Sequence, residues 1–152
     1  MTGYRAWLVF ALLAIGWAGL PKAAAAPAPA GPVGVWATAG ELSHVEVKPC
    51  GAPLCGDVVW LKEPLDKSGK PKTDILNSDP GLRSRKILGL RLLSGFVKAA
   101  DAGKWDSGLI YNPQDGKTYH CTLTMEDADH MTVRGYVGVP LFGKSEQWTR
   151  VK

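Results

Sequence analysis

The sequence predicts an all-β fold, a small antiparallel up-and-down β-barrel of about eight strands. Three observations predict it. Residues 33–152 divide into short apolar runs at close spacing, the segments between them are rich in Gly, Pro, Asn and Asp, and no run has a strong helical periodicity. A sheet of this size must also hide its edge strands, and closure into a barrel does so.

The first 26 residues are expected to be a secretory signal peptide. Residues 6–20 form an uncharged apolar run, and the small residues 23–26 follow it where a signal peptidase would cut. A run of this length is short for a bilayer span, which needs about twenty residues. The alternative is an uncleaved N-terminal anchor. Residues 27–32 are expected to be a Pro/Ala linker, and residues 33–152 a single barrel domain that is periplasmic or secreted.

Composition and charge exclude some classes of function. The chain has 152 residues, of which 18 are Lys or Arg and 14 are Asp or Glu. Removal of residues 1–26 takes away two basic residues and leaves a net charge of +2. That charge is too small for a general nucleic-acid binder, so we expect no nucleic-acid partner and no transmembrane span after signal cleavage.

The first half of the domain contains four expected strands. Residues 35–47 should form two strands around a turn at Gly40, and residues 54–62 a third. Residues 66–85 are polar and should form a long irregular loop, which is uncommon in a compact domain unless it has a role. Residues 87–97 fit either a helix or a strand. We favour a bulged strand, because Gly89 and Gly95 interrupt the run.

The second half carries the clearest periodicity. Residues 107–111 and 117–125 should pair around a turn at residues 112–116, and in the second strand alternate residues are apolar from Tyr119 to Met125. Residues 131–139 form the next expected strand, in which Val137 and Val139 share a face with Val133. Residues 146–151 should be the last strand. If it neighbours the first, Arg150 can lie over the indole of Trp36 and close one barrel end. The alternative is that Trp36 and Trp148 are both ordinary core residues.

Several motifs, in this order, match a known family. They are GVW at 34–36, CGAPLCG at 50–56, VVWL at 58–61, NSDPGLR at 77–83, GLIYNP at 108–113, GKTY at 116–119, VRGYVGVPLFGK at 133–144 and QWTR at 147–150. Through them the chain resembles the bacterial secreted family called domain of unknown function 2147 (DUF2147). The resemblance implies a lipocalin-like barrel and brings no established activity. The GxW start and the late Arg also look like the calycin superfamily, whose members bind small apolar molecules inside barrels.

The three cysteines suggest one bridge and one free thiol. Cys50 and Cys55 flank a Gly/Pro turn between two strands, so in an oxidising compartment a disulfide is the favoured interpretation over a metal pair or redox motif. Cys121 falls on the apolar face of its strand and should be a small buried residue rather than a reactive thiol.

The sequence gives little support for an enzyme, and we expect no catalysis, cofactor or metal. His44, His120 and His130 are scattered, without the spacing of metal ligands, and no Ser has a nucleophile-elbow context. Residues 66–74 superficially resemble a calcium loop, but their lysines and proline spoil the ligand spacing. We therefore expect residues 66–74 to be solvated. A hydrolase centred on residues 66–85 is a weaker alternative.

The working hypothesis is an exported barrel that binds a small apolar or amphipathic ligand, such as a fatty acid. Arg83 belongs to a basic and apolar segment, residues 77–91, that would suit the ligand's anionic group at the barrel mouth. Alternatively, Arg83 bonds carbonyls of its own turn. The expected lining residues, chosen by alternation and bulk, are Trp60, Leu92, Phe96, Tyr111, Tyr119, Leu123, Met125 and Val133.

A small barrel can also be filled by its own side chains, and that leaves a second hypothesis open. With a solid core, the protein would be an envelope interaction or structural module. Its candidate surface for a protein partner is Tyr136 with residues 140–144, because aromatic residues are enriched at interfaces.

Overall fold

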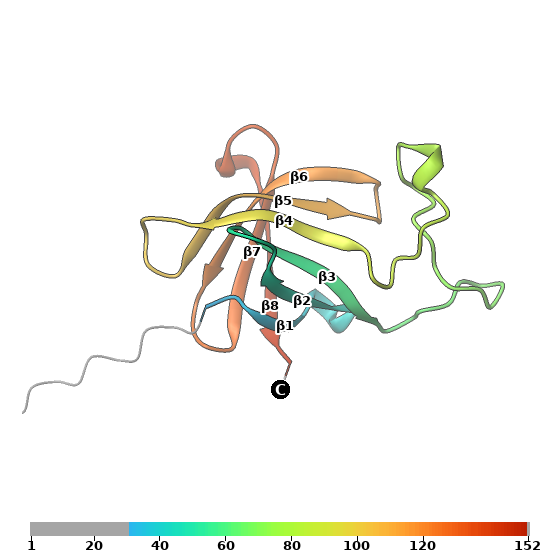
Figure 1. Ribbon diagram of the computed structural model, residues 1–152, viewed down its shortest axis with the longest axis horizontal. Helices are drawn as coiled ribbons and strands as arrows, with labels where there is room; N and C mark the ends of the chain where they lie inside the picture. The colour runs from blue at the N-terminus through green and yellow to red at the C-terminus, as the bar shows by residue number, and fades with distance from the viewer. Residues whose placement is uncertain (1–30, 152) are drawn as a thin grey trace, which may run out of the picture.

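The computed structural model describes residues 31–151 and confirms the predicted barrel (Figure 1). Each strand pairs antiparallel with the next, and the last pairs with the first, so the sheet is closed. The strands are β1 (Gly34–Ala37), β2 (Ser43–Pro49), β3 (Leu54–Leu61), β4 (Arg91–Lys98), β5 (Lys104–Asn112), β6 (Lys117–Met125), β7 (His130–Tyr136) and β8 (Lys144–Arg150). Three 3-10 turns lie in the connections: η1 (Ala39–Glu41), η2 (Pro80–Leu82) and η3 (Pro140–Phe142).

The up-and-down order places alternate connections at the same end of the barrel. Residues 38–42, 62–90, 113–116 and 137–143 lie at one end, which we call the open end. Residues 31–33, 50–53, 99–103 and 126–129 lie at the other, the closed end. The 62–90 loop is by far the longest connection and extends beyond the strands in Figure 1. The predicted signal peptide and residues 27–30 of the predicted linker lie outside the described residues.

Trp36 and Arg150 cover the closed end of the barrel. The Arg150 guanidinium lies 4.3 Å from the centre of the Trp36 ring. It also donates to the carbonyls of Val33 and Gly31 at 2.9 and 3.0 Å, and Trp36 Nε1 donates to the carbonyl of Pro32 at 2.7 Å. Gly31 and Pro32, which the sequence assigned to the linker, therefore belong to the folded domain.

The backbone conformation and surroundings of Gly34 explain why the GxW motif begins with glycine. Its φ of +136° is strained for a residue with a side chain, and a Cβ would lie 2.5 Å from Arg150 Nη1. Only glycine leaves room for the guanidinium between the N-terminal segment and Trp36. The closure thus joins Gly34 and Trp36 at the start of the domain to Arg150 at its end.

The interior next to the closed end is a packed core. Its buried side chains come from all parts of the sheet. They include Trp36, Val45, Val47, Val58, Leu93, Phe96, Cys121, Leu123, Met125 and Met131. The ring of Phe96 fills the space above Gly108, where a Cβ would approach it within 2.3 Å. This half of the barrel has the dense packing typical of protein interiors.

Several strands differ from their predicted extents, and the backbone explains two of the differences. The strand expected at residues 87–97 is confirmed as β4, but it begins at Arg91, because Gly89 adopts φ +86° in a turn. The strand expected at residues 131–139 ends at Tyr136, since Gly138 has φ +74° and Pro140 cannot continue the ladder. The prediction that Val137 and Val139 share the inward face with Val133 is therefore wrong: both are exposed.

Candidate functional site

A half-enclosed cavity of about 520 Å³ occupies the open end of the barrel. Its floor is formed by Leu92, Ile110, Val133 and Trp148, from four different strands. All four belong to the hydrophobic core or pack against it. The barrel is thus solid at the closed end and hollow at the open end.

Gly135 is one reason why the cavity is not filled. In β7, Met131 and Val133 point inward, and the next inward position is Gly135. An added Cβ there would meet Ile110 Cγ2 at 3.5 Å and Tyr119 Cβ at 3.8 Å, which are ordinary contacts. A side chain could be accommodated at this position, and it would project into the cavity.

Polar groups line the upper part of the cavity. The Tyr119 hydroxyl donates to Asp115 Oδ2 at 2.7 Å, and Lys144 and Glu146 contribute charges from β8. Burial opposes ionisation of Asp115, but hydrogen bonds from Tyr119 and from the Lys117 amide outweigh it and hold the pKa of Asp115 below its usual value. The bond to Asp115 raises the pKa of Tyr119. The site therefore combines an apolar floor with a charged rim.

Of the residues that were expected to line a cavity, some do so and others lie in the packed core. Leu92, Tyr111, Tyr119 and Val133 line it. The remaining inward-pointing candidates are buried in the solid half of the barrel and are not part of the cavity wall; they are Phe96, Leu123 and Met125. Ile110, Trp148 and Gly135 line the cavity and were not predicted. Alternation along a strand indicates which residues face inward, but it does not show which layer of the barrel is left unfilled.

The inward orientation predicted for Trp60 is wrong. Its side chain is 42% exposed and stacks on His44, with 4.3 Å between ring centres. The register between β2 and β3 shifts beside it: Val45 pairs with Val58, whereas His44 pairs with Trp60. The bulge inserts Val59 as an extra residue on β3. Regular alternation would place Val58 and Trp60 on the same face, but the extra residue leaves Val58 inward and turns Trp60 outward.

The 62–90 loop is held to the barrel by a buried carboxylate, Asp74. Tyr111 donates its hydroxyl to Asp74 Oδ1 at 2.7 Å, and Asn77 Nδ2 and Arg85 Nε both donate to Oδ2 at 2.9 Å. The Asp74 side chain is fully buried. The expectation that residues 66–74 are all solvated is therefore wrong at Asp74, because three donors from the loop and the barrel replace its water.

These contacts also determine the ionisation of Asp74. Burial by itself would raise its pKa, but the hydrogen bonds from Tyr111, Asn77 and Arg85 outweigh burial and keep the pKa below its usual value. The pKa of Tyr111 is raised, first by its own burial and then by the bond to Asp74. Asp74 is thus a charged acceptor at neutral pH, and Tyr111 connects it to the cavity wall.

Arg83 does not lie in the cavity wall. Its Nε donates to the carbonyl of Asn77 at 2.8 Å, which closes the turn that contains η2. Arg83 therefore bonds a carbonyl of its own turn, as in the alternative given for it in the sequence analysis. Arg85 instead faces a second hollow of about 550 Å³ between the loop and the β5–β6 hairpin, along with Lys117, Leu82 and Val137.

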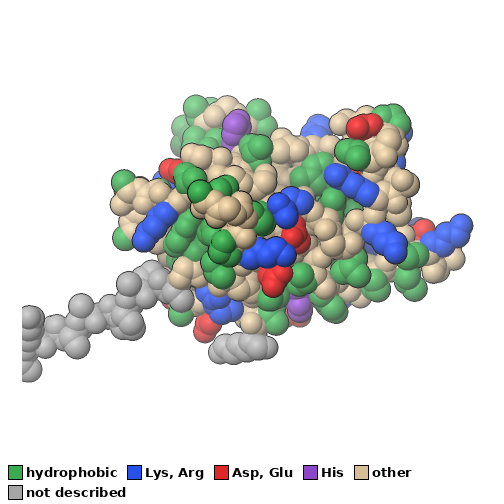
Figure 2. Space-filling view, in the orientation of Figure 1, with side chains coloured by type: hydrophobic (Ala, Val, Ile, Leu, Met, Phe, Trp, Pro, Cys, Tyr) green, Lys and Arg blue, Asp and Glu red, His purple; other side chains and the backbone are tan. Residues whose placement is uncertain are grey.

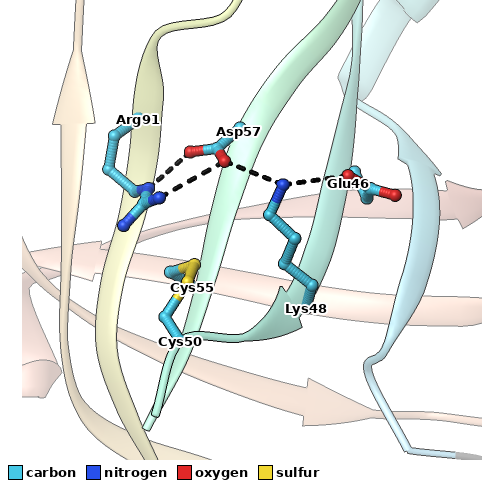
Figure 3. The surroundings of a disulfide bond; sticks show 6 residues. All are labelled: Glu46, Lys48, Cys50, Cys55, Asp57 and Arg91. Atoms are coloured by element: carbon cyan, nitrogen blue, oxygen red, sulfur yellow. Dashed lines mark hydrogen bonds and ion pairs between the residues drawn. A yellow bond between two sulfur atoms is a disulfide. The ribbon is translucent and has the colours of Figure 1, made fainter.

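The Cys50–Cys55 disulfide is confirmed and lies outside the cavity (Figure 3). It joins the start of β3 to the turn before it, with 5.8 Å between the Cα atoms. Beside it on the outer face, Lys48 bridges Glu46 and Asp57 at 3.1 Å each, and Arg91 pairs with Asp57. The Arg91 hydrogen bond is the main reason that the pKa of Asp57 is lowered.

Cys121 is a free, fully buried thiol in the core. Burial raises its pKa to about 12, so it remains protonated at physiological pH. Within residues 31–151, no group of three or more His, Cys, Asp or Glu side chains is arranged to hold a metal ion. In the same part of the chain, none of the helices has the length and apolar character needed to cross a membrane.

Comparison with known proteins agrees with this geometry. The model of a family described as an uncharacterized protein conserved in bacteria, DUF2147, matches residues 34–150. The chain belongs to this family. Among solved structures, it is similar to Protein HP1028 from Helicobacter pylori, which is described as belonging to the lipocalin family. The identity is 25% and the TM-score is 0.66, over 84% of this chain and 85% of that one. No curated protein matches the sequence.

Proposed function

We propose that this DUF2147 protein binds one small amphipathic molecule, of the fatty-acid or lipid-like class, without catalysis. The observation that carries the proposal is the cavity of about 520 Å³ with an apolar floor and a charged rim. Its size lies in the range of about 300–1,000 Å³ typical of small-molecule sites. The lipocalin family described for the similar Helicobacter pylori protein supports the same class of function.

The two ends of the cavity suggest how such a ligand lies. Its apolar part would pack on Leu92, Ile110, Val133 and Trp148, where burial from water is favourable by about 25 cal/mol per Å². Its polar group would lie at the open end, near Lys144. We assign no catalytic step, because the surface against which the bulk of a ligand would lie is apolar.

We also propose that the protein works outside the cytoplasm, in the periplasm or after secretion. The Cys50–Cys55 disulfide supports this, since disulfides persist in oxidising compartments. The apolar N-terminal segment with small residues after it is the second support.

Calorimetric titration with dodecanoic acid tests the proposal, with native mass spectrometry to count bound molecules. We expect one molecule per chain. Gly135→Leu places a side chain in the cavity and should weaken binding at least tenfold, whereas Gly135→Ala adds only a methyl group with ordinary contacts and should bind like the wild type. Absence of binding by the wild type, or equal binding by both variants, would contradict the proposal. It would favour the alternative of an interaction module acting through Tyr136 and residues 140–144.

A further inference from the structure

We propose that the open end of the barrel docks on an anionic lipid surface, with the 137–143 loop inserted into the interface. The inference does not rest on ligand binding in the cavity, because it concerns the apolar side chains exposed to solvent around its mouth. It is carried by the apolar composition of the loop, by its rigid support and by the lysines beside it.

The 137–143 loop exposes large apolar side chains to an unusual degree. Val137, Leu141 and Phe142 are 71%, 79% and 80% exposed, and Val139 is also exposed. No residue of the loop is charged. Figure 2 shows hydrophobic side chains gathered over this loop at the top of the molecule. Such a cluster on a soluble domain marks a site of interaction.

The loop is held in place although its side chains are exposed. Arg134 donates from Nε to the carbonyl of Pro140 at 2.8 Å, from Nη2 to the carbonyl of Leu141 at 3.2 Å and from Nη1 to Ser145 Oγ at 2.9 Å. Pro140 begins η3, which carries both Leu141 and Phe142. The apolar side chains are therefore presented on a fixed backbone, and little conformational entropy is lost when they insert.

The apolar loop continues around the mouth of the cavity. Phe142 and Leu42 line the same cavity, and Val137 lines both this cavity and the second hollow, where it meets Leu82. Leu42 and Leu82 are themselves exposed. The open end thus has an apolar rim contributed by three loops.

The charges favour an anionic lipid surface over a neutral one. Lys144 lies on the cavity rim, which Glu146 also lines, and Lys117 lies on the second hollow, where Asp115 attracts it electrostatically. The four loops at the open end together carry seven Lys or Arg residues and six Asp or Glu residues. The 50–53, 99–103 and 126–129 loops at the closed end carry four acidic residues and no basic one. This asymmetry would orient the open end toward negative headgroups.

Flotation with lipid vesicles tests the inference. The purified protein is mixed with vesicles of phosphatidylcholine alone or of phosphatidylcholine with phosphatidylglycerol. We expect stronger binding to the anionic vesicles, and weakening by salt. Replacing Leu141 and Phe142 together by Ser should reduce binding at least tenfold, because insertion of apolar area supplies much of the affinity.

A matched variant shows whether position matters. Val97 and Leu109 are exposed on the barrel wall, and replacing both by Thr removes apolar surface there; binding should be unchanged. Replacing Lys117 and Lys144 by Gln should weaken binding to anionic vesicles by roughly fivefold per lysine, and leave binding to neutral vesicles unchanged. Near-ultraviolet circular dichroism checks that each variant is folded.

Three results would overturn the inference. The first is that the wild type floats with neither vesicle, and the second is that the Leu141/Phe142 variant floats like the wild type. The third is that the protein binds no vesicle but self-associates with increasing concentration, and that the Leu141/Phe142 variant does not. The loop would then contact a second copy of the chain. Titration with dodecanoic acid in the absence of vesicles distinguishes failure of docking from failure of the cavity proposal.

Discussion

Loss of the Tyr111 hydroxyl should release the 62–90 loop from the barrel. The hydroxyl donates to the fully buried Asp74 carboxylate, and it also accepts from Asn77 at 2.9 Å. A hydrogen bond to a charged group contributes about 1.5–3 kcal/mol. Asp74 keeps its bonds from Asn77 and Arg85 in Tyr111→Phe, so the fold should survive. The opening equilibrium of the loop should then rise roughly 10- to 100-fold.

Limited proteolysis with trypsin measures this opening. The loop contains seven Lys and Arg residues, and the backbone next to Lys72, Arg85 and Lys86 is paired within the docked loop, so cleavage at these three residues requires local opening. When opening is fast relative to cleavage, the cleavage rate follows the population of the open form. The matched control is Tyr119→Phe, which removes a hydroxyl bonded to Asp115 rather than to the loop. Equal cleavage rates for Tyr111→Phe, Tyr119→Phe and the wild type would refute the role assigned to Asp74.

Acid should have the same effect as the mutation. The pKa of Asp74 is lower in the folded protein than in the unfolded chain, where it is about 3.9. The carboxylate therefore stabilises the docked loop fully above that pH, and its contribution is lost as the pH falls through the lower folded pKa. Cleavage of the loop by an acid protease should increase only below about pH 4, and less in Tyr111→Phe, which has already lost one of the bonds.

Three further predictions concern the barrel itself. Gly108→Ala should destabilise the protein by about 1–3 kcal/mol in urea unfolding, because the new Cβ displaces the Phe96 ring, and an unchanged midpoint would contradict this packing. Arg150→Met should lower the melting temperature and expose Trp36, seen as a red shift in fluorescence, through loss of the stacking contact and of two bonds to the N-terminal segment. Iodoacetamide should not modify Cys121 in the native protein at pH 8. After denaturation without a reducing agent it should add one label per chain, and two or more labels would exclude the disulfide.

Local patterns predicted the fold because each strand carries its own signal. The alternation from Tyr119 to Met125 and the turn residues at 112–116 are sufficient to place β5 and β6. Trp36 and Arg150 could be paired because closure of an antiparallel barrel makes the first and last strands neighbours. These are consequences of pattern and topology alone.

The cavity and the loop could not be predicted in the same way. Trp60 turns outward at a bulge that no residue pattern in β2 or β3 announces. Asp74 looks like any loop carboxylate, and only the fold brings Tyr111 to it from 37 positions away. An inward glycine does not by itself mark a hollow: Phe96 fills the space above Gly108, whereas Gly135 lines the cavity, and this difference appears only once the neighbours are known.

The central claim is that the open half of the barrel, and not its packed half, receives the ligand. Methyl NMR during titration with dodecanoic acid tests it most directly. We predict saturable shifts at Leu92, Ile110 and Val133, on the cavity floor, with little change at Val45 and Val47 near the closed end. Shifts confined to Val45 and Val47, or no shift at any of these methyl groups, would contradict the account.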